Sequence, residues 1–439
     1  MSGVRRLSLL TSLTFLAAVD SALAQAGGGS SGFGGGGGGG GGGGFGGGGS
    51  GGGDGGDGIG ILIFVAVFAV IALAGAIGAW RYRRKVRARA ARVRTASAEA
   101  AEDDAYFAAD QLEREARDLF VQAQAAWDAR DRARLAQLVG PDLLVEWNRR
   151  LDDFDKKGWH NRVSVMAGPV IQYAGLTNRE DDTEDRAVVR IEAQLSAYVL
   201  DSEGQKIMRT GESDELVELC EYWTLARHDD RWTVVSIEQK SEGDHQLDAK
   251  IVASPWSDDR LGDEALTELA VADRVPDGFT TADLAEVSFQ GSQRALALDL
   301  SLADARFAPD LLEVAARRTV EAWAEAVDGD DAPLEAIATA GAISRLLYGD
   351  DASRRTRLVV RGPLVKQIRI TDVDVEHEPA TMSIEVDVQG RRYVENRDTA
   401  AVLSGSKEDA HSFVERWTLA LDGPDESPWR LIETSAATA

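Results

Sequence analysis

Two glutamates hold equivalent positions on apolar strand faces and could act as acid–base groups. Strict alternation places Glu221 on one face with Val217, Leu219, Trp223 and Leu225. Glu415 lies in the same way among Phe413, Trp417, Leu419 and Leu421. An apolar environment raises the pKa of a carboxyl group and can make it a general base. The alternative is structural: each glutamate pairs with a helix-borne arginine or caps a helix end, because a buried charge needs a partner.

The presence of the glutamate at both positions favours the structural role, since one duplicated constraint is simpler than two identical active sites. The other reactive side chains form no recognisable site. The five histidines are scattered and lack metal-binding spacing: His160, His228, His245, His377 and His411. Cys220 is the only cysteine, so the chain closes no internal disulfide and offers no thiolate zinc site. We therefore predict no catalytic residues, no metal, no cofactor and no enzymatic activity.

A short aromatic motif occurs twice in the chain. Glu221-Tyr222-Trp223-Thr224-Leu225-Ala226 corresponds to Glu415-Arg416-Trp417-Thr418-Leu419-Ala420, and Trp232 and Trp429 follow the two copies. Upstream, Gly168-Pro169 matches Gly362-Pro363, and Ala126-Trp127 matches Ala322-Trp323. Recurrence in the same order indicates two copies of one domain. We place them at residues 102–245 and 306–435, joined by a linker at 246–305 that contains short helices.

Each copy begins with helices and continues with strands. In the first copy, apolar residues recur at helical spacing from 112 to 127 and again from 143 to 154. Alternating runs then predict strands at 163–176, 187–200, 216–226 and 231–237. The second copy predicts helices at 309–327 and 333–348 and strands at 356–373, 380–389, 410–421 and 428–433. This order predicts an α+β fold, with the helices packed on one face of a curved antiparallel sheet.

The repeated motif, with its closing tryptophan and the helices ahead of it, resembles the Tim44-like domain family. The resemblance implies two tandem cone-shaped domains, similar in fold to nuclear transport factor 2. It also implies a membrane-associated, non-enzymatic role. The mitochondrial member of that family tethers a chaperone motor to an import channel and contacts cardiolipin. Bacterial members place a signal peptide, a Gly-rich tract and one membrane helix ahead of the domain.

The N-terminal part of this chain has the same order of segments. Residues 1–24 read as a signal peptide, with Arg5 and Arg6 before an apolar run and small residues at its end. Residues 25–58 form a Gly-rich tract that we expect to be disordered. Residues 59–80 contain no charged side chain and are long enough to span a bilayer as a helix.

A basic juxtamembrane segment follows at residues 81–101. The positive-inside rule places it, and the C-terminal domains, in the cytoplasm, with the Gly-rich tract on the other side of the cell membrane. We predict that six of its cations contact the membrane surface, where anionic headgroups are candidate ligands: Arg81, Arg83, Arg84, Lys85, Arg87 and Arg89. The alternative is that these residues only determine the topology.

Charge limits the choice of partners. From residue 95 onward the chain carries 70 acidic and 38 basic residues. Such a body repels nucleic acid, whose binding depends on cations. Together with the predicted anchor, the resemblance to the Tim44-like family implies a membrane-anchored adaptor or scaffold whose domains bind an unknown protein partner or lipid. The alternatives are an enzyme with a cone pocket and a structural membrane organiser that forms homo-oligomers. Ala72 and Ala76 in the anchor provide a weak small-xxx-small pair for such self-association.

Overall fold

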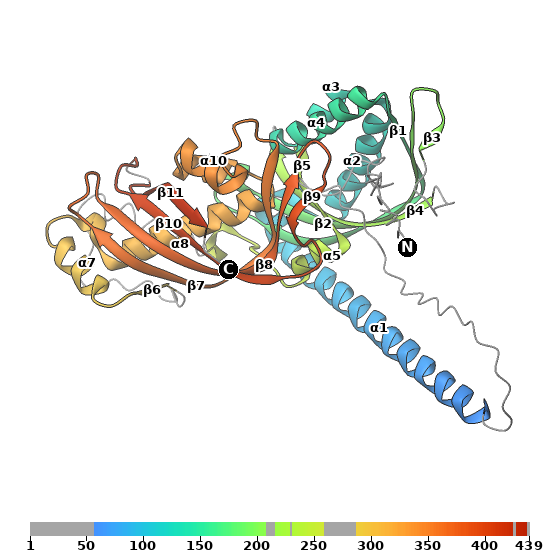
Figure 1. Ribbon diagram of the computed structural model, residues 1–439, viewed down its shortest axis with the longest axis horizontal. Coiled ribbons are helices and arrows are strands. Elements are labelled where there is room, and N and C mark those ends of the chain that lie inside the picture. Colours follow the sequence, from blue (N-terminus) through green and yellow to red (C-terminus); the bar gives the residue numbers. More distant parts are fainter. Residues whose placement is uncertain (1–56, 208–215, 229–230, 259–286, 425–426, 437–439) are drawn as a thin grey trace, which may run out of the picture.

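The computed structural model describes residues 57–207, 216–228, 231–258, 287–424 and 427–436, and leaves aside the side chains of residues 57–69, 71 and 436. The expected signal peptide and nearly all of the Gly-rich tract lie outside the described residues. So does the middle of the linker, at 259–286. Within the described part, two α+β domains follow a long N-terminal helix (Figure 1).

Helix α1 (Asp57–Asp103) is 47 residues long and continues without a break from the predicted anchor into the first domain. Among residues whose side chains are described, no helix is long and apolar enough to cross a membrane. More than half of the span predicted at 59–80 falls on side chains that are not described. The basic segment and the start of the first domain thus belong to one helix.

In the first domain, three helices precede a strongly bent sheet. They are α2 (Ala109–Ala129), α3 (Arg132–Leu138) and α4 (Pro141–Lys157), with a short 3-10 turn, η2 (Ala105–Phe107), ahead of them. The sheet has the order β1-β2-β4-β5 and every pair is antiparallel. Its strands are β1 (His160–Thr177), β2 (Arg186–Leu200), β4 (Leu216–His228) and β5 (Arg231–Gln239), and β3 (Lys206–Ile207) pairs with β2. The connection to β2 contains η3 (Asp182–Glu184), and α5 (Lys240–Gly243), η4 (Asp244–Leu247) and η5 (Pro255–Ser257) follow the sheet.

The second domain repeats this architecture. Its helical elements are α7 (Gln293–Ser301), η6 (Ala305–Phe307), α8 (Pro309–Asp328), α9 (Ala332–Ile337) and α10 (Ala340–Tyr348). Its main strands are β7 (Thr356–Asp374), β8 (Thr381–Asn396), β10 (His411–Ala420) and β11 (Arg430–Ala436), in the order β11-β10-β8-β7-β6, and β9 (Val402–Gly405) pairs with β8. One edge strand, β6 (Val287–Phe289), is parallel to β7, contrary to the expected antiparallel sheet. The helices between β6 and β7 provide the long crossover that parallel pairing requires.

Helices cover the inner face of each sheet and enclose its core. Trp127 of α2 and Trp323 of α8 are both fully buried. The loop before the last helix of each set forms an isolated parallel bridge to the last strand, Val139 to Val234 in the first domain and Ala338 to Leu431 in the second. Recurrence of such details confirms two tandem α+β domains with helices packed on a sheet.

The outer face of the first sheet is also covered, by α1 and the segment after β5. Val86 of α1 packs there with four other residues, Ala174, Val188, Tyr222 and Leu247. The second domain lies against the same region, because the hydroxyl of Tyr393 donates to Glu242 of α5 at 2.9 Å. Ala400 of the second domain is even part of the first domain's apolar core. Both domains and the C-terminal half of α1 therefore pack together as one body.

Candidate functional site

The repeated motif residues of the first domain are part of its core. Trp223 is buried, and its ring lies 5.3 Å from that of Phe120 on α2. Its Nε1 donates to Glu221 at 2.8 Å, and Gln239, opposite Glu221 on β5, donates to the other carboxylate oxygen at 2.8 Å. The carboxylate of Glu221 therefore has hydrogen-bond donors on the sheet, and no helix-borne arginine is needed to explain its burial.

The second copy differs in its polar contacts. Trp417 packs against Trp323 of α8, with the ring centroids 5.4 Å apart. Glu415 lies 3.7 Å from Arg392, which belongs to strand β8 and not to a helix. Burial raises the pKa of Glu415, and Arg392 opposes this effect. The expectation of a helix-borne arginine is thus wrong for this residue, because the neighbouring strand brings a guanidinium to the same face.

The closing tryptophans pack on matching 3-10 turns. The ring of Trp232 lies 5.7 Å from that of Phe107, and the ring of Trp429 lies 5.6 Å from that of Phe307. In the second domain, Trp429 Nε1 also donates to the carbonyl of Arg306 at 3.0 Å. The six motif residues are therefore buried. The tryptophans join the sheets to helices or 3-10 turns, and the glutamates pair with residues on the sheets, which supports a structural role.

The six cations expected at the membrane surface divide into two groups. Arg89 is buried, and it donates to the carbonyls of Ala174 at 2.6 Å and Ala249 at 2.7 Å. It holds the helix to the first domain and is not available to lipid, so its assignment is corrected. Lys85 pairs with Asp248 at 2.6 Å but is still exposed. Arg81, Arg83, Arg84 and Arg87 are exposed on α1.

A cavity of about 680 Å³ opens between this part of α1 and the outer face of the first sheet. Its lining runs from Gly78 and Ala79, at the end of the predicted span, to Gln172, Arg190 and Glu192 on the strands. A second hollow of about 810 Å³ continues along the sheet and shares four of its residues, Arg190, Glu192, Glu218 and Lys240. The cavity thus begins where the predicted membrane span ends.

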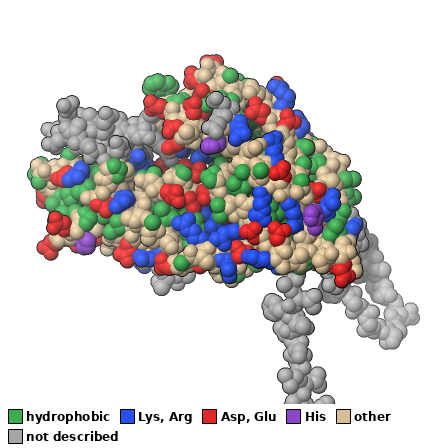
Figure 2. Space-filling model, turned by 90° about the horizontal axis from the view of Figure 1, so that it is seen from above, with side chains coloured by type: hydrophobic (Ala, Val, Ile, Leu, Met, Phe, Trp, Pro, Cys, Tyr) green, Lys and Arg blue, Asp and Glu red, His purple; other side chains and the backbone are tan. Residues whose placement is uncertain are grey.

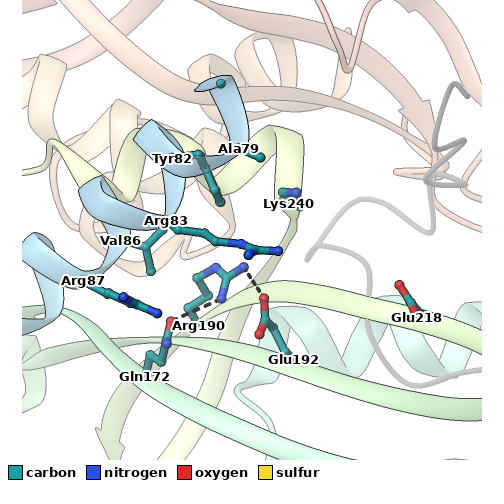
Figure 3. A pocket seen from close by; sticks show the side chains of 11 residues that line it. Ala79, Tyr82, Arg83, Val86, Arg87, Gln172, Arg190, Glu192, Glu218 and Lys240 are labelled. Carbon is teal, nitrogen blue, oxygen red and sulfur yellow. Dashed lines mark hydrogen bonds and ion pairs between the residues drawn. The ribbon is translucent and has the colours of Figure 1, made fainter. Parts of the chain in front are cut away.

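Four cations come together in this cavity. Arg83 and Arg87 extend from α1 toward Arg190 on β2, and Lys240 lies at the rim (Figure 3). Arg190 is 5% exposed; it donates to Gln172 at 3.2 Å and to Glu192 at 2.6 Å, and its Nε has no partner among the described residues. Guanidinium groups in this arrangement suit a phosphate, which accepts several charge-assisted hydrogen bonds at once.

Cys220 lies on the wall of the second hollow. Burial raises its pKa to about 11, so this side chain is a protonated thiol at neutral pH. It offers neither a nucleophile nor a thiolate ligand there.

Sequence reasoning found the α1 cations but missed Arg190 and Lys240. Both lie on the opposite side of the cavity, more than 100 positions along the chain. The available signal was Arg190 itself, because a cation between the apolar residues Val189 and Ile191 of a strand needs a partner.

Comparison with known proteins agrees with this architecture. Residues 93–239 and 290–436, about two thirds of the chain, each match the Tim44-like domain. The chain therefore belongs to the Tim44-like domain family. No curated protein matches it.

Two solved structures show distant similarity. One is the intermembrane space region of the chloroplast protein ARC6, with 14% identity and a TM-score of 0.24, covering 29% of this chain and 95% of that one. The other is an NTF2-like protein involved in plasmid conjugation, with 10% identity and a TM-score of 0.19, covering 75% of this chain and 95% of that one. Similarity at this level supports no statement about function.

Proposed function

We propose that the chain is a single-pass, membrane-anchored scaffold whose two Tim44-like domains bind a protein partner at the cytoplasmic face. The continuity of α1 carries this proposal. The predicted span and the first domain share one helix, and Val86 and Arg89 of that helix pack on the domain. A flexible linker would let the domains move far from the bilayer. A continuous helix holds them beside it, as a scaffold requires.

The cavity beside α1 adds a lipid headgroup to this proposal. A body with strong net negative charge would be repelled by an anionic bilayer. The cations Arg83, Arg87 and Arg190 form a local exception where the predicted span ends. We infer that they bind the phosphate of an anionic headgroup and so fix the orientation of the domains on the membrane.

The scaffold role also implies that the repeated glutamates are structural, and the contacts of Glu221 support this. Glu221 accepts hydrogen bonds from Trp223 and Gln239, so its charge already has a structural use. A general base needs a carboxylate that is open to a substrate. Trp223 and Gln239 occupy the oxygens that a substrate proton would approach.

Alkaline extraction and protease protection test the anchor and its orientation. The full chain, expressed in a bacterial host with a reporter after Ala439, should stay in the membrane fraction at high pH. A version that lacks residues 1–80 should be released. The reporter should resist protease added to intact spheroplasts. Extraction of the full chain would contradict the anchor, and digestion of the reporter would contradict the orientation.

Lipid retention tests the headgroup site. The full chain in nanodiscs that contain phosphatidylglycerol should keep bound anionic lipid in native mass spectrometry. The variant Arg83→Gln/Arg87→Gln should lose most of it, because two of the cavity cations are removed. Arg114→Gln/Arg117→Gln removes two exposed arginines from α2 and is the matched control. Equal loss in both variants would show general charge attraction and no specific site.

A further inference from the structure

Three aspartates from two distant segments meet at the end of α1 in the first domain. Asp104 directly follows α1, and Asp182 and Asp185 lie in and just after η3, between β1 and β2. One carboxylate oxygen from each lies within 4.8 Å of the others. Asp182 is exposed, Asp104 is intermediate and Asp185 is buried, so the group has one side open to water.

Asp185 is oriented by two hydrogen bonds. The hydroxyl of Tyr106 donates to one of its oxygens at 2.7 Å, and the backbone N–H of Arg179 donates to the other at 2.8 Å. Burial raises the pKa of Asp185 to about 6, and Asp104 and Asp182 add to this effect. The pKa of Asp104 is also raised, mainly by burial and in addition by the nearby charge of Asp182. Three carboxylates held this close repel one another unless a cation or a proton compensates them.

A buried hydroxyl without a partner lies within the electrostatic influence of Asp185. Tyr173 on β1 is 1% exposed, and its Oη has no hydrogen-bond partner among the described residues. Asp185 is the charged group in its surroundings, and after burial it further raises the pKa of Tyr173. A buried polar atom normally has a partner, so the hydroxyl of Tyr173 calls for a group that the described residues do not supply.

In the second domain, the aspartate that corresponds to Asp104 is neutralised by an arginine of the chain itself. Asp104-Ala105-Tyr106-Phe107 corresponds to Asp304-Ala305-Arg306-Phe307, and both segments enter a 3-10 turn. Arg306 pairs with Asp304 at 2.7 Å and lowers the pKa of that carboxyl group. In the first domain, a tyrosine stands in place of this arginine while two further aspartates approach. Arg227 lies over the ring of Tyr106 at 4.0 Å and opposes the rise in the pKa of Asp104, but that pKa is still raised.

We propose that Asp104, Asp182 and Asp185 bind a hard divalent cation, Ca²⁺ or Mg²⁺. Oxygen ligands are those that both ions prefer. Three oxygens within 4.8 Å of one another can surround Ca²⁺, which takes its ligands at about 2.3–2.6 Å, after at most a slight shift of the side chains. Mg²⁺, at about 2.0–2.1 Å, needs a small contraction. An ion-bound water supplies the partner for Tyr173.

Bound in this way, the cation ties the end of α1 to the β1–β2 connection of the first domain. This ligand departs from the sequence expectation of no metal, which rested on histidine and cysteine spacing. The proposal is independent of the scaffold function.

Terbium luminescence tests the site, because Tb³⁺ takes the same oxygen ligands and is excited by nearby aromatic rings. Tyr106 touches the site, and its ring lies 5.7 Å from that of Trp232. The full chain in uncharged phosphatidylcholine nanodiscs should give saturable Tb³⁺ emission on excitation of the aromatic rings. Ca²⁺ or Mg²⁺ should compete for the site, and the ion that competes at lower concentration is the preferred one.

Asp182→Asn should weaken Tb³⁺ binding at least tenfold. Asp182 is exposed, so this change leaves the fold intact, and a circular dichroism spectrum checks this. Asp304→Asn in the second domain is the matched control and should bind as the wild type does. Emission that does not saturate, equal binding by Asp182→Asn, or failure of both divalent ions to compete would overturn the proposal.

Discussion

At the scale of single residues, one buried ion pair responds to pH. Glu238 is fully buried at the end of β5; His245 lies 2.7 Å from one of its oxygens, and Gln246 donates to the other at 3.0 Å. Burial disfavours the charge on Glu238, but His245, together with Arg361 and Gln246, outweighs burial and lowers the pKa of this carboxyl group to about 2. Burial disfavours the charged form of His245 as well. The carboxylate of Glu238 outweighs burial, so the pKa of His245 is raised.

The signs of these shifts predict a pH-dependent stability. The histidine's contribution is fully present below its unfolded pKa of about 6.5 and is lost as pH rises through its higher folded value. The glutamate's contribution is present above about pH 4.3 and is lost toward pH 2. The pair therefore stabilises the fold most between these limits, by about 1.5–3 kcal/mol for a hydrogen bond between charged groups.

His245→Gln should thus lower the melting temperature of the full chain in detergent most at pH 6. The difference in melting temperature between His245→Gln and the wild type should be smaller at pH 8 or 9. His377→Gln is a suitable control, because His377 is exposed. A difference between His245→Gln and wild type that stays constant across this range would contradict a charged pair.

At the scale of elements, α1 is held to the first domain by a buried arginine as well as by apolar contacts. Burial lowers the pKa of Arg89 to about 10. Its two carbonyl partners lie on different segments, at Ala174 in β1 and at Ala249 after η4. Arg89 therefore connects the helix to the sheet and to the segment that leads away from it.

Replacing this arginine should loosen α1 without melting it. Arg89→Met leaves two carbonyls without a donor, at about 1–3 kcal/mol for each group that becomes both buried and unpaired. Hydrogen exchange should rise in the described part of α1 between Tyr82 and Arg94. Arg92→Met changes an exposed arginine on the same helix and should leave the exchange as it is. The same rise in both variants would mean that Arg89 has no special anchoring role.

At the scale of the whole molecule, the two domains share a buried charged interface. Arg150 of α4 lies 3.3 Å from Glu395 of β8, and Arg397 lies 3.3 Å from Glu146 of α4. Lys407 completes the group at 3.0 Å from Glu395. Burial raises the pKa of Glu146 to about 7, although Arg397 opposes this shift.

Breaking this interface should uncouple the domains. Arg397→Met removes one partner of a buried pair and should cost about 3–5 kcal/mol, because Glu146 loses its nearest cation. We expect calorimetry of the full chain to show one unfolding transition for the wild type and two for the variant. Glu146→Leu/Arg397→Met should restore much of the coupling.

Arg355→Met is the control for this interface. Arg355 forms an exposed pair with Asp398 at 3.2 Å, and such pairs contribute about 1 kcal/mol at most. A single transition in the Arg397→Met variant would show that apolar contacts, such as that of Ala400, suffice to hold the domains together.

The surface of the whole molecule is less uniform than its net charge implies. Acidic and basic side chains lie beside one another on the face shown in Figure 2. Local groups of cations, such as the one beside α1, can therefore attract anions although the body as a whole is acidic.

The sequence by itself determined the duplication, the α+β class and the family, because these depend on local patterns. Apolar residues at helical or alternating spacing show which face of an element is buried, and the repeated Trp223 and Trp417 marked the same strand in both domains. The helix predicted at 333–348 was resolved into α9 and α10 only in the structure. A loop between them bonds to β11, a long-range contact that no local pattern encodes.

Only the tertiary structure decided which charged residues meet. Arg89, one of the cations expected at the membrane, is buried because α1 packs on β1. Glu146 and Arg397 are 251 positions apart, and Asp104 and Asp185 are 81 apart. A periodic pattern shows that a face is buried but not what it is buried against, and charge–charge contacts depend on that partner. Pairing across domains, the cavity beside α1 and the aspartate site therefore follow from how the elements pack.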